Sequence, residues 1–344
     1  MRVDAIVDLQ YGSTGKGKIA ALLARSKKYG ASVRVQSIQA GHTIYYNDKP
    51  YKMRTIPCAW VNLNVSLVLG PGIFIEKDLL LEEINMINEA TGEDVRERLY
   101  LDFRATYINH QDYESEDGMA DSIGSTQEGA GASLVRKIMR REDVVQVQHD
   151  SWAEDNGINV IDTVDYLNTQ DMVMLEGCQG TMLSIHSSPF YPYCTSRECT
   201  VAGIMSEAGM APADIDTVHG VFRTYPIRVG GKSGPTFGDE ITWEEVGRRS
   251  NNPILKPEIT TVTKRERRIF EFSMYELKHA IQLNKPDYLH CGFINYIDHD
   301  DYGKDRFEDL SMQSKAFVQH VERETGVPIM TIGTGEKPHH IIRR

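Results

Sequence analysis

Several features that mark other classes of protein are scarce or missing in this chain of 344 residues. Its five cysteines are odd in number and form no C-x-x-C pair, so neither a disulfide framework nor a structural zinc site is expected. No apolar run approaches the ~20 residues of a membrane helix, and the N-terminus lacks the layout of a signal peptide. These absences favour a cytoplasmic protein with no membrane partner.

Positive charge is also scarce, since the formal net charge is −11. A protein that binds nucleic acid in general needs a basic face, so nucleic acid is not an expected partner. Basic residues still gather at 136–141 and at 264–268. Each cluster is read either as a site for an anionic small molecule or as a solvated helix face.

Apolar runs alternate with helical patterns along most of the chain, and several of the runs are continuously apolar. Strands are expected at Val3–Leu9, Ser32–Ser37, Val65–Leu69, Met172–Leu175, Thr217–Phe222, Asp287–Ile294 and Ile329–Ile332, and helices after Lys16 and at Leu79–Ala90, Ser273–Leu283 and Met312–Thr325. This pattern predicts an α/β fold, with a mostly parallel central sheet covered by helices. We expect a single domain over 1–344, with long functional loops at 39–47, 112–131, 186–198 and 228–236.

The stretch Gly12-Ser13-Thr14-Gly15-Lys16-Gly17-Lys18 follows the first apolar run and has the G-x-x-x-x-G-K pattern of a loop that wraps phosphates. Its glycines let backbone N–H groups face an anion, and its lysines add charge at a helix N-terminus. Ile19 stands where an ordinary P-loop carries a hydroxyl for Mg²⁺, and the loop has no acidic residue. A plain Gly/Lys turn is the alternative interpretation.

Seven motifs together resemble the adenylosuccinate synthetase family, in the family's order and along the whole chain. They are Gln10-Tyr11-Gly12 with Gly15-Lys16-Gly17-Lys18, Ala40-Gly41-His42-Thr43, Ile123-Gly124-Ser125-Thr126, Glu176-Gly177-Cys178-Gln179-Gly180-Thr181, Tyr191-Pro192-Tyr193-Cys194-Thr195-Ser196, Arg228-Val229-Gly230 and Gly333-Thr334-Gly335. The resemblance implies a P-loop-like fold and a ligase. In that family a nucleoside triphosphate phosphorylates a purine 6-oxygen, and the amine of L-aspartate then displaces the phosphate.

The resemblance also implies a role for each motif. His42, Lys16 and Ser13 take the catalytic positions, with His42 as proton donor at the 6-oxygen. The triphosphate site comprises Gly12, Ser13, Thr14, Gly15, Lys16, Gly17, Lys18, Gly41, His42, Thr43, Asn295, Gly333, Thr334 and Gly335. The monophosphate nucleotide site comprises Ser13, Gln39, Thr126, Arg140, Gln179 and Thr195. The aspartate site comprises Val262, Thr263, Arg265 and Arg267, where guanidinium forks suit carboxylates.

Two further expectations come from the same resemblance. The cofactor is Mg²⁺, with Ser13 and Gly41 as ligands. Arg140 matches the arginine that reaches the partner's nucleotide phosphate, which implies a homodimer. Lys264 replaces the glycine that the family usually has in the aspartate loop.

Two departures from the family pattern change the expected substrates. Ser13-Thr14 stands where the family carries Asp-Glu, and the smaller, uncharged serine leaves room beside the 2-position of the purine. This substitution is similar to a bacteriophage branch of the family that uses dGMP in place of IMP. Asn295 stands at the position of an aspartate that reads the guanine of GTP, and an amide suits an adenine edge instead. The expected substrates are therefore dGMP, L-aspartate and ATP or dATP, in a host cytoplasm if the source is viral.

Two alternatives stay open at this point. One is a divergent adenylosuccinate synthetase that acts on IMP, against which Ser13 counts. The other is a nucleotide-binding protein that has lost catalysis with its loop carboxylate, against which His42, Gln179, Arg265 and Arg267 count.

Overall fold

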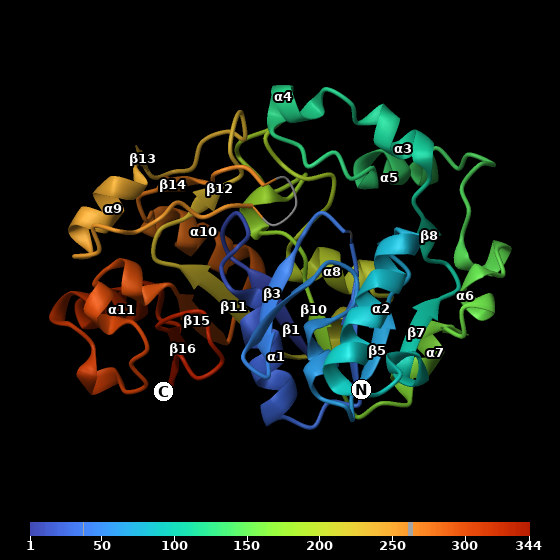
Figure 1. Ribbon diagram of the computed structural model, residues 1–344, viewed down its shortest axis with the longest axis horizontal. Helices are drawn as coiled ribbons and strands as arrows, with labels where there is room; N and C mark the ends of the chain where they lie inside the picture. Colours follow the sequence, from blue (N-terminus) through green and yellow to red (C-terminus); the bar gives the residue numbers. More distant parts are fainter. Residues whose placement is uncertain (37, 261–263) are drawn as a thin grey trace.

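A ten-stranded sheet forms the centre of the computed structural model, which describes residues 1–36, 38–260 and 264–344 (Figure 1). Its order is β17-β16-β15-β11-β1-β10-β2-β5-β7-β9, and every neighbouring pair is parallel except β16 and β17 at one edge. The strands are β1 (Arg2–Asp8), β2 (Ala31–Arg34), β5 (Ser66–Leu69), β7 (Leu99–Asp102), β9 (Asn159–Ile161), β10 (Met172–Glu176), β11 (Ile215–Arg223), β15 (Tyr288–Gly292), β16 (Ile329–Gly333) and β17 (Ile341–Arg343). The expected mostly parallel α/β fold is confirmed.

Helices cover both faces of this sheet, as the continuously apolar strands predict. Along β1, Ile6 joins the core under α1 and α2, whereas Val3, Ala5 and Val7 join the core under α8, α10 and α11. These helices are α1 (Lys16–Ser26), α2 (Lys77–Thr91), α8 (Val201–Glu207), α10 (Met274–Asn284) and α11 (Met312–Thr325). The others are α3 (His110–Ser115), α4 (Met119–Ile123), α5 (Ala130–Ile138), α6 (Trp152–Asp155), α7 (Thr163–Asn168) and α9 (Trp243–Arg249). No helix in the described part of the chain is both long and apolar enough to cross a bilayer.

The parallel register brings polar residues from distant segments to one edge of the sheet. Ile6 of β1 lies beside Glu176 of β10, and Arg34 of β2 pairs with Glu176 on the other side. Asp8 ends β1 at this same carboxyl edge, beside Val221 of β11. Loops at the carboxyl ends of parallel strands are where α/β proteins place their ligand sites.

Three of the four expected loops contain residues of regular structure, although 228–236 includes only the last residue of β12 (Ile227–Arg228). The segment 39–47 includes β3 (His42–Tyr46), which forms a hairpin with β4 (Lys49–Met53), and 112–131 includes α4 with the ends of α3 and α5. β3 was expected as a loop, but its threonine, isoleucine and two tyrosines are typical strand residues, and it pairs with β4. The strand expected over 32–37 ends at Arg34, and Ser37 lies outside the described residues.

Two small sheets complete the fold. One has the order β12 (Ile227–Arg228), β14 (Arg268–Phe270) and β13 (Glu240–Ile241), and the other pairs β6 (Phe74–Ile75) with β8 (Thr106–Tyr107). In Figure 1 the first lies with α9 at the upper left and α3, α4 and α5 lie at the upper right, while both termini lie at the lower side. The segment 186–198 has no helix or strand, as expected.

Candidate active site

The phosphate loop joins β1 to α1 and is held by a carboxylate. Asp8 Oδ1 accepts hydrogen bonds from the backbone N–H of Gln10 (2.8 Å) and of Gly12 (3.3 Å). Its Oδ2 accepts one from the Thr14 hydroxyl (2.6 Å). Ser13 has a left-handed backbone with φ 55°, an uncommon conformation for a residue with a side chain. The chain thus turns sharply into α1, whose free N–H groups favour an anion.

A cavity of about 420 Å³ opens over this loop. Its lining combines the loop, the start of β3, the end of β15 and the turn after β16. Of the predicted triphosphate residues it includes Ser13, Thr14, Gly15, Lys16, Gly17, Lys18, Gly41, His42, Thr43, Asn295, Gly333 and Gly335. Gly12 and Thr334 are not in its lining, and Thr334 is fully buried, with its hydroxyl donating to the Lys304 carbonyl (2.8 Å).

The two lysines of the loop bond to different parts of the chain. Lys16 Nζ donates to the Gln179 carbonyl and lies 3.9 Å from Asp8 Oδ2. Lys18 Nζ donates to the carbonyls of Gly335 (2.8 Å) and His340 (2.6 Å), and burial lowers its pKa to about 8. Lys18 therefore fastens α1 to the turn after β16, a structural contact that the motif alone does not indicate.

A second, smaller cavity of about 140 Å³ gathers the neutral residues predicted for the monophosphate nucleotide. Gln39, Thr126, Gln179 and Thr195 all line it. Gln179 has φ 53°, and its carbonyl accepts a hydrogen bond from Lys16, which lines the large cavity, so this contact links the two cavities. Ser13 lines only the larger of the two cavities.

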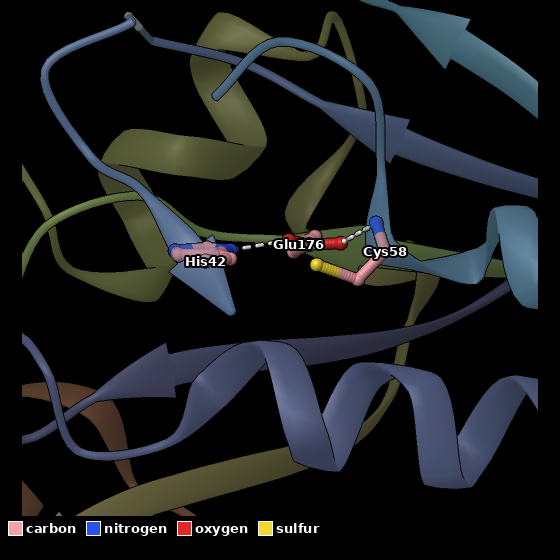
Figure 2. A group of neighbouring side chains, drawn as sticks. All are labelled: His42, Cys58 and Glu176. Atoms are coloured by element: carbon pink, nitrogen blue, oxygen red, sulfur yellow. Dashed lines mark hydrogen bonds and ion pairs between the residues drawn. The ribbon is translucent and has the colours of Figure 1, made fainter. Parts of the chain in front are cut away.

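His42 lies at the start of β3 and contacts a buried carboxylate (Figure 2). Its Nδ1 forms a hydrogen bond with Glu176 Oε1. The other carboxylate oxygen, Oε2, accepts a hydrogen bond from the backbone N–H of Cys58 (2.7 Å). Arg34, also fully buried, has Nη1 3.4 Å from Glu176 Oε1. Burial and the Arg34 cation hold the pKa of His42 below its usual value. Burial raises the pKa of Glu176, but the His42 hydrogen bond and the Arg34 charge outweigh it and hold that pKa low.

These charges fix the tautomer of His42. An ionised carboxylate only accepts hydrogen bonds, so Nδ1 carries the proton and Nε2 keeps its lone pair near neutral pH. A proton that arrives at Nε2 creates an imidazolium, which Glu176 stabilises. The pair therefore suits proton exchange with a group in the large cavity, which His42 lines.

The same cluster does not fit a magnesium ion. His42, Cys58 and Glu176 each offer one ligand atom, and these atoms lie within 4.8 Å of one another. Mg²⁺ prefers oxygen donors in octahedral geometry, whereas this set is mixed and has the Arg34 cation beside it. Oxygen donors suited to Mg²⁺ occur instead at the phosphate loop and at Gly41, in the large cavity.

An ionic cluster lies between the phosphate loop and the predicted aspartate segment. Glu258 pairs with Arg223 and lies 3.7 Å from the Nε of Arg267. Arg223 Nη1 also donates to the Ser13 carbonyl (3.0 Å), and its guanidinium stacks 3.8 Å from the centre of the Phe293 ring. The cluster thus connects three parts of the large cavity that are remote in sequence.

The predicted aspartate residues are only partly described. Arg267 lines the large cavity, whereas Arg265 does not, although both side chains are half-buried. Val262 and Thr263 lie outside the described residues. Lys264 has a left-handed backbone with φ 54°, the conformation that a glycine would adopt most readily.

Comparison with known proteins identifies the family. A model described as adenylosuccinate synthetase matches residues 5–159 and 146–302. The N6-succino-2-amino-2'-deoxyadenylate synthase of Vibrio phage phiVC8 is 35% identical over 86% of this chain and 86% of its own length. The chain belongs to the adenylosuccinate synthetase family. It is therefore a ligase, as the motifs predict.

Other family members share its length and fold. The adenylosuccinate synthetase of Methanococcus maripaludis strain S2 is 32% identical over 98% of this chain and 97% of its own. The structure of the succinoaminodeoxyadenylate synthetase of cyanophage S-2L, bound to dGMP and to dATP as an energy donor, is 29% identical with a TM-score of 0.83. It covers 99% of this chain and 95% of that one.

Four charged residues of this family member carry no role in the sequence-based prediction, namely Asp8, Glu176, Arg223 and Glu258. Asp8 and Glu176 each end an apolar strand, and a charge at that point is the signal that could have found them. Arg223 and Glu258 are recognisable only from their contacts in the fold.

Arg140 lies apart from both cavities. It follows α5, is exposed and has φ 55°. Neither cavity includes it in the lining.

Proposed function

We propose that this protein joins L-aspartate to the 6-position of dGMP with hydrolysis of ATP or dATP, giving 2-amino-2'-deoxy-N6-succinyladenylate. Ser13 is the observation that carries the choice of dGMP. It is small, uncharged and in the lining of the large cavity, where the family's usual aspartate would crowd a 2-amino group. The names of the two phage relatives, and the dGMP and dATP bound to one of them, support the same choice.

The residues of this chain divide the work between the two cavities. The smaller cavity, with its neutral amides and hydroxyls, would hold the sugar and phosphate of dGMP, with the base extending toward Ser13 and His42 in the large cavity. The phosphate loop would hold the triphosphate. The γ-phosphoryl group moves to the 6-oxygen, and the amine of aspartate then attacks C6 while phosphate leaves. His42, held by Glu176, exchanges a proton at that oxygen, and Lys16 balances the phosphate charge.

The cofactor of this reaction is proposed to be Mg²⁺, with Ser13 and the Gly41 carbonyl among its ligands. Both residues line the large cavity and offer oxygen, which fits the ion. When bound, the ion would neutralise charge on the triphosphate. Arg265 and Arg267 are proposed to hold the carboxylates of aspartate, with Arg267 released from Glu258 when the substrate enters.

We also propose a homodimer. α5 and the residue after it expose three large apolar side chains, with Val135 at 59%, Ile138 at 63% and Met139 at 69%. They stand directly before Arg140 in the chain. A contiguous exposed apolar patch of this kind marks an interface, and a second copy seated there would receive Arg140 at its own nucleotide site.

The test of the function is release of inorganic phosphate from ATP by the purified protein with Mg²⁺ and L-aspartate, compared between dGMP and IMP. We expect aspartate-dependent release with dGMP and little with IMP. Release with IMP alone would make the protein an ordinary adenylosuccinate synthetase. No phosphate release with either nucleotide, when dATP and GTP also fail as donors, would favour a binding protein without catalysis.

The variant Ser13→Asp sharpens this test, because it restores the residue that the family usually carries. Its carboxylate should crowd the 2-amino group and lower kcat/KM for dGMP, leaving the KM for aspartate little changed. Undiminished activity with dGMP would show that Ser13 does not make the room on which the substrate choice rests.

A further inference from the structure

A buried carboxylate lies directly under the phosphate loop, where a triphosphate would bind. Asp8 is 1% exposed and lines the large cavity. Its Oδ2 accepts a hydrogen bond from the Thr14 hydroxyl (2.6 Å) and lies 3.9 Å from Lys16 Nζ. A carboxylate, a hydroxyl and an ammonium group therefore meet at the base of the loop. The hydrogen bonds that hold the loop do not by themselves account for a charged group at this place.

A structural role in the loop explains only one of the two carboxylate oxygens, Oδ1. Oδ1 accepts the backbone N–H groups of Gln10 and Gly12, and the amide oxygen of an asparagine could do the same. Oδ2 adds a negative charge that repels a triphosphate at close range. Lys16 offsets that charge in part, but at 3.9 Å it is beyond a direct hydrogen bond and its Nζ donates to the Gln179 carbonyl.

A divalent cation between this charge and the triphosphate removes the conflict. A carboxylate and a hydroxyl are oxygen donors of the kind that Mg²⁺ takes together with phosphate oxygens. Position 13 has lost its carboxylate and position 19 has no hydroxyl, so the loop otherwise lacks a strong metal ligand. Asp8, at the end of β1, supplies a carboxylate, and Thr14, in the loop, supplies a hydroxyl. The two groups are already hydrogen-bonded to each other.

We propose that the Asp8 carboxylate and the Thr14 hydroxyl form the oxygen-donor pair of this protein for the Mg²⁺ that accompanies the triphosphate. This inference rests on the proposed function, because the ion is required only if a triphosphate binds to the loop. It adds two residues to Ser13 and Gly41 and assigns the charged ligand to a strand end rather than to the loop.

The experiment measures ATP binding by calorimetry without dGMP or aspartate, so that no turnover occurs. Each protein is titrated once with Mg²⁺ and once with EDTA, and the ratio of the two dissociation constants is compared. In the wild type Mg²⁺ should tighten binding. Asp8→Asn should reduce this enhancement by about 10-fold or more. Its metal-free binding should be equal or tighter, because a repulsive charge is gone.

Thr14 provides an independent variant. Thr14→Val removes the hydroxyl and should also reduce the enhancement by Mg²⁺, whereas Thr14→Ser keeps it and should preserve the enhancement. If Asp8→Asn fails to fold, this pair carries the same test. Paramagnetic resonance of Mn²⁺ in the ATP complex gives a second readout, since loss of a carboxylate ligand changes the spectrum of the bound ion.

Asp102→Asn is the matched control. Asp102 is also a buried aspartate that ends a strand of the central sheet, but it bonds Arg104 and the backbone N–H of Thr163, outside both cavities. It should leave the enhancement unchanged. If Asp8→Asn and Thr14→Val weaken ATP equally with and without Mg²⁺, Asp8 only holds the loop and the inference is overturned. If the wild type binds no ATP or dATP in either condition, the proposed function fails and the inference with it.

Discussion

At the residue scale, the site depends on charges that are buried in pairs. Arg34 and Glu176 are each fully buried, and His42 bonds the same carboxylate. Removing one member of a buried ion pair leaves the other uncompensated, which destabilises a protein by about 3–5 kcal/mol. In the proposed mechanism Glu176 also supports proton exchange at His42, so a substitution there must be examined for both folding and catalysis.

Glu176→Gln should lower kcat more than it weakens nucleotide binding. The amide cannot stabilise an imidazolium as a carboxylate does, so we expect a loss in kcat of about 100-fold or more. Phosphate release and nucleotide dissociation constants measure the two effects, and circular dichroism reports folding. Cys58→Ala is the control, because it keeps the backbone N–H that bonds Glu176. Equal losses in kcat and in affinity would assign Glu176 to structure alone.

A second buried carboxyl should give the stability of the protein a pH dependence. Burial raises the pKa of Glu276 to about 7, although the Tyr11 hydroxyl donates to it at 2.8 Å. The folded state therefore retains a proton that the unfolded chain releases near pH 4.5. Because the folded state binds more protons between these values, the contribution of Glu276 is present below pH 4.5 and falls as the pH rises to about 7.

The change amounts to about 3 kcal/mol across that window. Glu276→Gln should remove it, so the difference in unfolding free energy between variant and wild type should change between pH 5 and pH 8. Denaturant titrations at both values measure it. Parallel pH profiles for the two proteins would show that Glu276 does not titrate in this range.

At the element scale, the sequence predicts the buried strands and the turn from β1 into α1, but not the pairing of polar segments. All seven expected strands belong to the central sheet, because a continuously apolar strand is stable where helices bury both of its faces. β7, β9 and β17 were not predicted, since each is short and partly polar. The hairpin of β3 and β4 was also not predicted, although the β-branched and aromatic residues of β3 and the left-handed turn residues Asn47 and Asp48 are typical of one.

The same limit applies to the site. His42 could be predicted from its motif, but its bond to Glu176 spans 134 residues of sequence and exists only because β10 and β3 approach each other in the fold. Arg223 is similar, because its contacts with Ser13 and Glu258 lie 210 and 35 residues away. Motifs indicate candidate binding loops, whereas the fold determines which charged residues lie beside those loops.

The turn after β15 should determine which triphosphate is used. Asn295 lines the large cavity there, and the ring of Phe293 has one face against the Arg223 guanidinium. Asn295→Asp creates an acceptor for the N1–H and the 2-amino group of guanine. The ratio of kcat/KM for GTP to that for ATP should rise by about 10-fold or more, the value of a bidentate base contact. Asn168→Asp, an exposed position on α7, is the control. An unchanged ratio would remove Asn295 from donor recognition.

At the scale of the whole molecule, the site draws on both ends of the chain. The large cavity has Asp8 in its lining and also Gly335 and Ile341, because the last strands return to the same sheet, where only β11 and β15 separate β16 from β1. Arg140 is the exception. It is exposed beside the apolar patch of α5 and lines neither cavity, and in the proposed homodimer it would reach the nucleotide of the second copy.

Mixing two inactive variants tests this directly. Arg140→Ala removes the side chain that one subunit contributes to its partner's site. His42→Ala removes a side chain that each subunit contributes to its own site, so both variant proteins should be nearly inactive. After unfolding and refolding together in equal amounts, half of the dimers are mixed, and in each of these one of two sites has His42 and the partner's Arg140. Phosphate release should return to about a quarter of the wild-type rate. If Arg140 acts within its own subunit, no site in a mixed dimer is complete and no activity returns. Ile138→Asp, which places a charge in the apolar patch, should abolish both the dimer in sedimentation and the recovery.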